Sequence, residues 1–235
     1  MADADYETFF IDDARLRIPL VGLNRGVRGR LTDGGYEHFE RDLARAHLRP
    51  GDRLLDLGSG AGLVAIIAAR IIGGTNVVTV EPNPEMHHCL RRNLRDNAGR
   101  EVRLIKAAVV PDDFPDKTVT LHLRSGFWSA TTKSDAGPCM RPVEVRAKRF
   151  RQLLRSVRPT AITMDIEGAE AALLTKRLPD HVRLIVTELH PHLYGENTRD
   201  EIIASLKLQG FRNLNKKKTE DVYAFGRAVA AQDPT

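Results

Sequence analysis

The chain has 235 residues, of which 42% are hydrophobic and 29% are charged, values that are typical of a globular domain. The longest apolar segment is interrupted by Arg70 and the acidic start does not resemble a signal peptide, so we expect no membrane segment and a cytoplasmic location. Because only Cys89 and Cys139 occur, a disulfide framework is not expected. The net charge of +5 is spread over the chain, so solvated surface charge is a better explanation for it than a nucleic-acid-binding face.

The chain is predicted to divide into an N-terminal segment of short strands, one main domain and a short tail. These parts are residues 1–32, 33–228 and 229–235. In the N-terminal segment, 9–11 and 16–19 are strand candidates on either side of a turn at Asp12 and Asp13, and the glycines and arginines of 22–29 suggest a loop.

Strand and helix patterns alternate through the main domain. Strands are expected near 53–57, 77–81, 102–106, 161–165 and 183–188. Helices are expected near 36–46, 62–72, 84–96, 169–177 and 198–209. Such alternation predicts an α/β fold with a mostly parallel sheet that is covered by helices on both faces. The last two strands, 211–215 and 222–225, are joined by a short charged turn, so we expect a hairpin that makes the final strand antiparallel.

Residues 110–149 interrupt this alternation between the third and fourth strands. Hydrophobic and polar residues alternate over 119–123 and over 143–147, which predicts a long β-hairpin insertion. Its tip, 124–141, contains Phe127 and Trp128, and is interpreted either as a mobile insertion or as a cover for a bound ligand.

A glycine-rich turn follows the first core strand, in the stretch Leu54-Leu55-Asp56-Leu57-Gly58-Ser59-Gly60-Ala61-Gly62. Glycine has no Cβ, so the backbone at this turn is expected to pass close to a ligand, and the first amides of the next helix would face that ligand. A dinucleotide site has glycine or alanine where this chain has Leu63, which disfavours a nicotinamide-dependent oxidoreductase. The pattern D-x-G-x-G-x-G resembles motif I of the class I methyltransferases, which use S-adenosylmethionine.

The second core strand ends at Glu81. An acidic residue in this position is placed to accept hydrogen bonds from the two hydroxyls of a ribose. Asn83 and Pro84 are suited to the start of the following helix.

The segment Asp165-Ile166-Glu167-Gly168-Ala169-Glu170 and the later Glu188-Leu189-His190-Pro191 resemble the FkbM family of methyltransferases. The resemblance extends over about 33–226 and includes Gly35-Tyr36-Glu37 and Ala107-Ala108-Val109. It implies a class I fold with a seven-stranded sheet, S-adenosylmethionine as the cofactor, and methylation of hydroxyl groups on natural products or sugars. The chain departs from many members at Ser59 and Ala61, which we expect to matter little because backbone amides make the contacts.

Two sets of site residues follow from these motifs and from the rule that ligands bind at the carboxyl ends of parallel strands. The predicted cofactor-binding residues are Asp56, Gly58, Ser59, Gly60, Gly62, Glu81, Pro82, Ala107, Ala108, Asp165 and Glu167. The predicted catalytic residues are His190, Asp165 and Glu188.

His190 is the candidate general base because the ordinary pKa of histidine lies near neutrality, and His192 and Tyr194 are alternates. A divalent metal held by Asp165, Glu188 and His190 is a further possibility. Their spacing matches no known ligand signature, so no metal site is predicted.

The sequence favours a methyltransferase that acts on a hydroxyl of a small molecule such as a sugar or a natural product. An RNA methyltransferase is the alternative suggested by the positive charge, although the chain lacks the N/D-P-P-Y/F segment of enzymes that methylate base amines. A nicotinamide-dependent oxidoreductase and a non-catalytic cofactor-binding protein fit the motifs less well.

Overall fold

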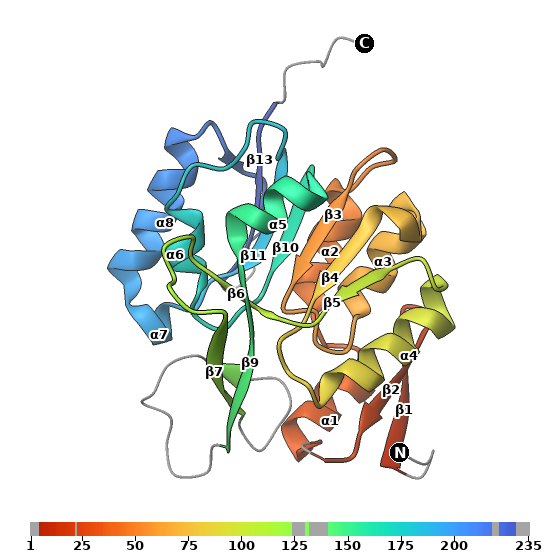
Figure 1. Ribbon diagram of the computed structural model, residues 1–235. Helices are drawn as coiled ribbons and strands as arrows, with labels where there is room; N and C mark the ends of the chain where they lie inside the picture. Colours follow the sequence, from red (N-terminus) through yellow and green to blue (C-terminus); the bar gives the residue numbers. More distant parts are fainter. Residues whose placement is uncertain (1–4, 22, 124–129, 132–140, 218–220, 229–235) are drawn as a thin grey trace.

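The computed structural model describes residues 5–21, 23–123, 130–131, 141–217 and 221–228. Its centre is a seven-stranded sheet in the order β12-β13-β11-β10-β3-β4-β5, with helices on both faces (Figure 1). The strands are β3 (Leu54–Leu57), β4 (Val77–Val80), β5 (Arg103–Ile105), β10 (Ala161–Met164), β11 (Leu184–Glu188), β12 (Arg212–Asn213) and β13 (Val222–Gly226). The predicted α/β sheet is therefore confirmed.

Every residue of β3, β4 and β10 is buried. These strands lie in the middle of a parallel sheet with both faces covered, which explains why each is apolar except for one buried polar residue: Asp56, Thr79 or Thr163. The terminal hairpin is also confirmed, because β13 pairs antiparallel with both β11 and β12.

Two hydrophobic clusters fill the spaces between the sheet and its helices. One cluster contains residues of α2 (His38–His47), α3 (Leu63–Ile72) and α4 (Met86–Ala98). The other contains residues of α5 (Phe150–Val157), α6 (Glu170–Leu174) and α8 (Glu196–Leu208). A short helix, α7 (Pro191–Tyr194), follows β11 at its carboxyl end.

Several helix boundaries differ from the predictions. The expected loop at 22–29 is wrong, because α1 (Arg25–Thr32) begins there with the Asn24 side chain accepting a hydrogen bond from the Val27 amide at 3.0 Å. Helix α4 begins at Met86 rather than at residue 84, because the Asn83 side chain accepts from the Glu85 amide and forms a turn before the helix. Helix α5 was not expected, since it directly continues a strand.

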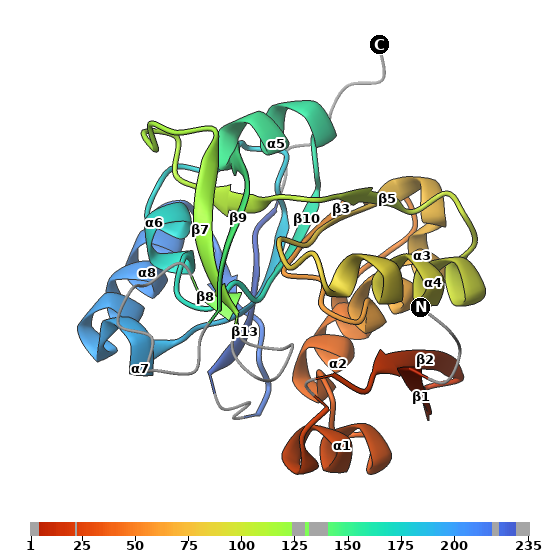
Figure 2. The same cartoon turned by 60° about the horizontal axis from the view of Figure 1, so that its bottom comes forward.

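The N-terminal segment packs against the main domain as a β-hairpin of β1 (Tyr6–Ile11) and β2 (Ala14–Pro19) (Figure 2). Asp12 and Asp13 both have positive φ, as a two-residue hairpin turn requires. The side chain of Leu16 is fully buried in the same cluster as α3, and the Asn93 side chain of α4 accepts a hydrogen bond from the Arg17 amide at 2.9 Å.

The predicted β-hairpin insertion is confirmed: β7 (Thr118–Leu123) and β9 (Arg141–Arg149) pair antiparallel and project from the central sheet (Figures 1 and 2). They form a separate small sheet with β6 (Ala108–Val110) and β8 (Ala130–Thr131). Residues 124–129 and 132–140, with Phe127, Trp128 and Cys139, lie outside the described residues, so the expected cover stays a prediction. No helix in the described parts of the chain is long and apolar enough to cross a membrane.

Candidate active site

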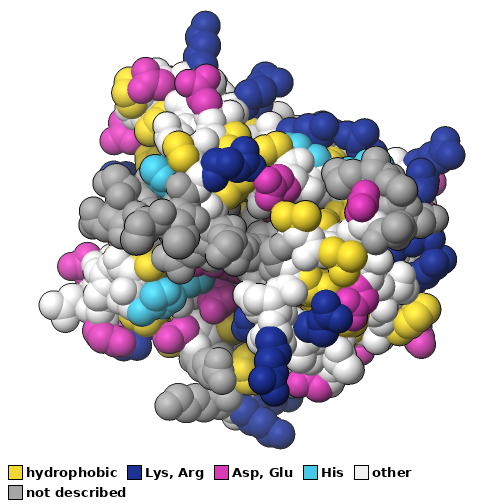
Figure 3. Space-filling model, turned by 90° about the horizontal axis from the view of Figure 1, so that it is seen from below, with side chains coloured by type: hydrophobic (Ala, Val, Ile, Leu, Met, Phe, Trp, Pro, Cys, Tyr) yellow, Lys and Arg dark blue, Asp and Glu magenta, His cyan; other side chains and the backbone are white. Residues whose placement is uncertain are grey.

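A cavity of about 630 Å³ lies where the parallel strands end. It is bordered by the turns after β3 and β4, the start of α2, the β6–β7 part of the insertion and the segments after β10 and β11. Seen from below, acidic and histidine side chains lie next to one another on this face of the molecule (Figure 3). The strand-end position agrees with the general rule for ligand sites in parallel sheets.

The three glycines of the turn after β3 all have positive φ, and each faces another part of the protein. A Cβ on Gly58 would lie 1.7 Å from the carbonyl oxygen of Asp165, and one on Gly62 would lie 2.5 Å from the side chain of Leu90. At Gly60 it would lie 3.0 Å from the hydroxyl of Tyr36. The absence of these side chains therefore serves internal packing, and only Gly58 and Gly60 also line the cavity.

Glu81 is buried under this turn and holds its shape. One of its carboxylate oxygens accepts a hydrogen bond from the Gly60 amide at 2.9 Å, and the other accepts from the Asn83 amide at 2.8 Å. Burial raises the pKa of Glu81 to about 7. Each carboxylate oxygen can accept more than one hydrogen bond, so these contacts leave capacity for the hydroxyls of a ribose in the cavity.

Asp56 and Ser59 lie beneath the turn and do not line the cavity. The Asp56 carboxylate accepts a hydrogen bond from the Thr163 hydroxyl at 2.6 Å, which links β3 to β10. The Ser59 hydroxyl donates to the Asp56 carbonyl oxygen at 3.3 Å. These two residues therefore support the turn from within the protein.

His190 lies at the centre of a group of carboxylates on the opposite side of the cavity. Its side chain is only 5% exposed, and its Nε2 lies 3.4 Å from Asp165 Oδ1 and 3.9 Å from Glu188 Oε1. Glu167 Oε2 is also 3.9 Å from Nε2. Asp165 and Glu167 thus both face His190, and Glu167 has a left-handed backbone conformation.

This arrangement shifts the pKa values of the group. Burial raises the pKa of Glu188 to about 7 against the opposing effect of His190. Burial alone would lower the pKa of His190, but Glu170, Asp165 and Glu188 outweigh it and raise that pKa to about 9. A protonated imidazole cannot accept a proton. The neighbouring carboxylates therefore disfavour a general-base role for His190 at neutral pH. A carboxylate with a pKa of about 7 suits that role better.

Glu170, the last residue of the D-x-E-G-x-E segment, has a structural role that was not predicted from the sequence. It is fully buried and accepts hydrogen bonds from the amides of Ile166 and Gly168 at 3.1 and 2.9 Å. Its Oε1 lies 3.2 Å from His190 Nδ1. On the other side, the His190 backbone amide donates to the Tyr194 hydroxyl at 2.7 Å. Both contacts orient the imidazole.

The segment before α2 and the first turn of that helix contribute three further cavity residues that were not among the predicted site residues: Tyr36, Glu37 and Glu40. The Tyr36 hydroxyl lies 3.5 Å from the Ala61 amide, close above the glycine turn. Burial raises the pKa of Glu37 to about 8, and burial also raises the pKa of Glu40, which is hydrogen-bonded to Glu188. The only signal in the sequence was the family-like Gly35-Tyr36-Glu37.

Most of the predicted site residues meet in this one cavity although they are far apart in sequence. Those that line it are Gly58, Gly60, Pro82, Glu81, Ala107, Ala108, Asp165, Glu167, Glu188 and His190. Asp56, Ser59 and Gly62 are excluded from the lining for the packing reasons given above. One ligand atom each of Asp165, Glu188 and His190 lies within 4.8 Å of the others, so this trio has the geometry to hold a metal ion.

Methyltransferases are among the curated proteins that this chain resembles. The C-methyltransferase UbiE of ubiquinone and menaquinone biosynthesis from Vibrio parahaemolyticus is 30% identical over 159 residues, which cover 65% of this chain and 56% of UbiE. An arsenite methyltransferase from Halobacterium salinarum is 27% identical over 173 residues, or 72% of this chain and 39% of that protein. The chain thus spans only about half the length of such curated relatives.

Among solved structures, Trm5b from Pyrococcus abyssi has a TM-score of 0.50 at 13% identity, covering 94% of this chain and 54% of that one, a similarity of fold alone. The family described as Methyltransferase FkbM domain matches residues 60–213, which include the motif at 165–170. The chain therefore belongs to the FkbM methyltransferase family, and its domain is a class I, S-adenosylmethionine-dependent methyltransferase domain.

Proposed function

We propose that this protein transfers the methyl group of S-adenosylmethionine to a hydroxyl oxygen of a small molecule such as a sugar or natural product. The observation that carries this proposal is the single cavity that contains both the glycine turn of motif I and the carboxylates around His190. Its volume of about 630 Å³ is within the usual range for sites that enclose a small ligand.

The residues of the cavity fit the cofactor. Glu81 is placed to accept hydrogen bonds from the ribose hydroxyls, with Pro82, Ala107 and Ala108 beside it. Asp165 also lines the cavity, where its carboxylate can interact with the ammonium group of the cofactor's methionine part. The negative lining also favours the sulfonium and ammonium groups of a cofactor whose net charge is positive.

The bound cofactor supplies an electrophilic methyl carbon on a sulfonium. The chain's own residues align the acceptor oxygen with that carbon and keep water away. As the carbon–oxygen bond forms and the carbon–sulfur bond breaks, the hydroxyl proton passes to one of the carboxylates around His190, which are Glu40, Asp165, Glu167 and Glu188. S-adenosylhomocysteine is the leaving group, and its sulfur is neutral.

A small acceptor is supported over nucleic acid by the charge of the cavity. Seven lining side chains are carboxylates: Asp33, Glu37, Glu40, Glu81, Asp165, Glu167 and Glu188. Such a surface repels the phosphates of RNA or DNA. The hydrophobic Leu121 of the insertion also lines the cavity and offers contact to an apolar part of an acceptor.

Calorimetric titration with S-adenosylmethionine, S-adenosylhomocysteine and NAD tests the cofactor assignment. We expect the first two ligands to bind and NAD not to bind. Glu81→Ala should weaken S-adenosylmethionine binding by about 1.5–3 kcal/mol, the value of hydrogen bonds to a charged group. The exposed Glu85→Ala is the matched control and should bind normally. Equal affinity in the two variants would contradict the role of Glu81.

A transfer assay with tritiated S-adenosylmethionine against total RNA, DNA, protein and a small-metabolite extract tests the acceptor class. Label in the metabolite fraction, in a product stable to ester hydrolysis, is the expected result. Label in RNA, with binding that weakens steeply as salt rises, would instead establish the RNA methyltransferase alternative.

A further inference from the structure

We propose that Asp165, Glu188 and His190 bind a divalent cation next to the position of the methyl acceptor. The three side chains follow two adjacent parallel strands: Asp165 comes directly after β10, and Glu188 and His190 come at and after the end of β11. One ligand atom from each lies within 4.8 Å of the other two. The role of the cation in turnover depends on the proposed methyl transfer, whereas the site itself depends only on this geometry.

A buried polar atom at this point lacks the hydrogen-bond partner that its position calls for. Asp165 Oδ1 is buried without a hydrogen-bond partner. It faces His190 Nε2 at 3.4 Å, and Nε2 is 3.9 Å from Glu188 Oε1. Both separations exceed the usual 2.7–3.2 Å of an N–H···O hydrogen bond. Since buried polar groups are nearly always satisfied, a ligand between these atoms is expected.

The surroundings of His190 are those of a metal-binding histidine. Such a histidine usually directs its second ring nitrogen at a carboxylate, which fixes the ring for coordination. Here Nδ1 faces Glu170 Oε1 at 3.2 Å, and the side chain of Glu170 is fully buried. The two backbone amides that bind Glu170 prevent it from swinging toward Nε2. Nε2 is therefore left to the cavity.

The ligand set indicates which cations fit. Two carboxylate oxygens suit Mg²⁺ and Mn²⁺, while an imidazole nitrogen suits Mn²⁺ and Zn²⁺ better than Mg²⁺. Mn²⁺ and Zn²⁺ both accept these two ligand types, and of the two only Mn²⁺ can be followed by electron paramagnetic resonance. Bond lengths of about 2.1 Å would place neighbouring ligand atoms roughly 3 Å apart, close to the distance between Asp165 Oδ1 and His190 Nε2.

Three protein ligands leave coordination positions that open toward the cavity. An acceptor hydroxyl bound there would become more acidic and would be held in one orientation. Glu167 and Glu40 stay next to the site as proton acceptors while Glu188 acts as a ligand.

The test uses the full-length protein, freed of metal with EDTA and titrated with Mn²⁺ while free Mn²⁺ is followed by electron paramagnetic resonance. We expect one bound Mn²⁺ per chain. Asp165→Asn and His190→Gln should lower the affinity by more than about 100-fold, and Glu170→Gln by about 10–100-fold. Glu201→Gln, which removes an exposed carboxylate on α8, should leave it unchanged.

Pulsed electron paramagnetic resonance gives a second readout, because a coordinated imidazole produces nitrogen couplings that should be present in the wild type and absent in His190→Gln. Circular dichroism checks that each variant is folded, and Glu188→Gln, at a side chain 37% exposed, replaces any variant that is not. Failure of the wild type to bind Mn²⁺, Zn²⁺ or Mg²⁺, or equal affinity in all variants, overturns the proposal.

Titration of the same samples with S-adenosylmethionine separates this inference from the proposed function. Cofactor binding and methyl transfer that persist in EDTA, without metal binding, would overturn only the cation site. Metal binding without cofactor binding would support the site and overturn the methyltransferase proposal. Loss of transfer in EDTA and its recovery on addition of Mn²⁺ would support both.

Discussion

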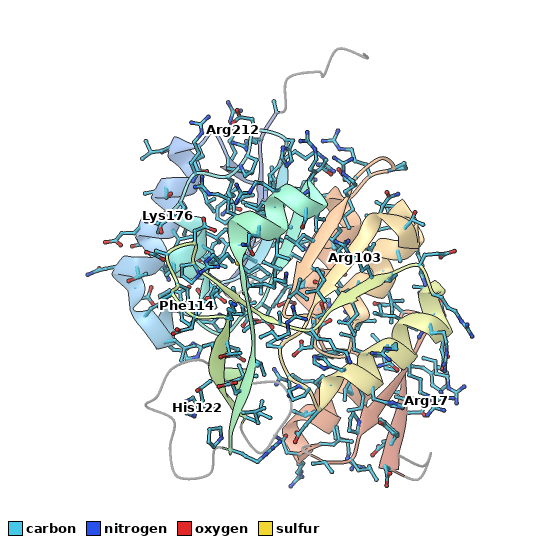
Figure 4. All side chains as sticks on the ribbon, in the orientation of Figure 1. Arg17, Arg103, Phe114, His122, Lys176 and Arg212 are labelled. Carbon is cyan, nitrogen blue, oxygen red and sulfur yellow. The ribbon has the colours of Figure 1, made fainter. Side chains whose placement is uncertain are left out.

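At the carboxyl ends of the parallel strands seven carboxylates line the cavity, whereas a second hollow at the opposite ends is lined by four arginines and two histidines. The arginines and histidines that line this second hollow are His47, Arg49, His181, Arg183, Arg212 and Arg227. Figure 4 shows Arg212 at the end of the molecule opposite His122 of the insertion. The net charge of +5 is therefore the sum of an acidic end and a basic end, and it does not give the local charge at either one.

The pKa values of the histidines differ between the two ends of the molecule. At the acidic end, neighbouring carboxylates outweigh burial and raise the pKa of His190 to about 9. At the basic end, burial lowers the pKa values of His47 and His181, and nearby arginines lower them further. The same side chain is thus cationic in one place and neutral in the other at neutral pH, because partners within a few ångströms determine its state.

The largest expected effect comes from removing a charge at the acidic end. Glu188→Gln should lower kcat about 10²–10⁴-fold, because it removes a group that orients the acceptor or takes its proton. Arg212→Gln at the basic end should change kcat by less than about twofold, as an exposed substitution away from the site. Similar losses in both variants, measured with the acceptor identified by the transfer assay, would mean that catalysis is not confined to the acidic end.

A second prediction concerns stability at the basic end, where Asp52 forms an ion pair with the nearly buried Arg183 and accepts from the Thr160 hydroxyl at 2.8 Å. Asp52→Ala should lower the free energy of unfolding by about 3–5 kcal/mol, because it removes the carboxylate that pairs with the mostly buried guanidinium of Arg183 and leaves that group, among the described residues, only the His47 carbonyl oxygen as an acceptor. Urea denaturation measures this change. The exposed Asp180→Ala, which removes the pair with Arg177, should cost at most about 1 kcal/mol.

The pH dependence of the Asp52 contribution has a defined sign. Burial opposes ionisation of Asp52, but hydrogen bonds from Arg183, Thr160 and the Arg49 amide hold its pKa below the usual value of 3.8. The contribution is present above the unfolded pKa and is lost as pH falls through the folded pKa. A difference between wild type and Asp52→Ala that persists below both values would contradict the ion-pair explanation.

The smallest effects are in the titration of the histidines, measured by NMR in EDTA. His190 should titrate near pH 9, and His47 and His181 below 6.5. Protonated His190 stabilises the fold fully below the unfolded pKa, and this contribution is lost as pH rises through about 9. His47 and His181 act in the opposite direction because their pKa values are lowered in the folded state. At these two residues the fold loses stability as pH falls below 6.5. Glu170→Gln should lower the pKa of His190 and leave the other two unchanged.

Local sequence patterns were sufficient to predict most of the sheet. Buried apolar runs such as β3 and β10, the terminal hairpin and the β7–β9 insertion each have a signature within a few residues, because side-chain periodicity follows backbone geometry. The rule that strand ends converge then brought Glu81, Asp165 and His190 into one predicted site. Helices such as α1 and α5, which depend on a few buried contacts, were not predicted.

What tertiary structure alone decided is the environment of these side chains. The sequence identified His190 as a group with a pKa near neutrality, but only the fold places Glu170, Asp165 and Glu188 around it and raises that pKa. It also shows that Gly58 and Gly62 make room for Asp165 and Leu90 rather than for a ligand. The sequence left a metal at Asp165, Glu188 and His190 as an open possibility, and only the fold shows that one ligand atom from each lies within 4.8 Å of the others. Electrostatic fields and close contacts depend on distances in space, and residues far apart in sequence set those distances.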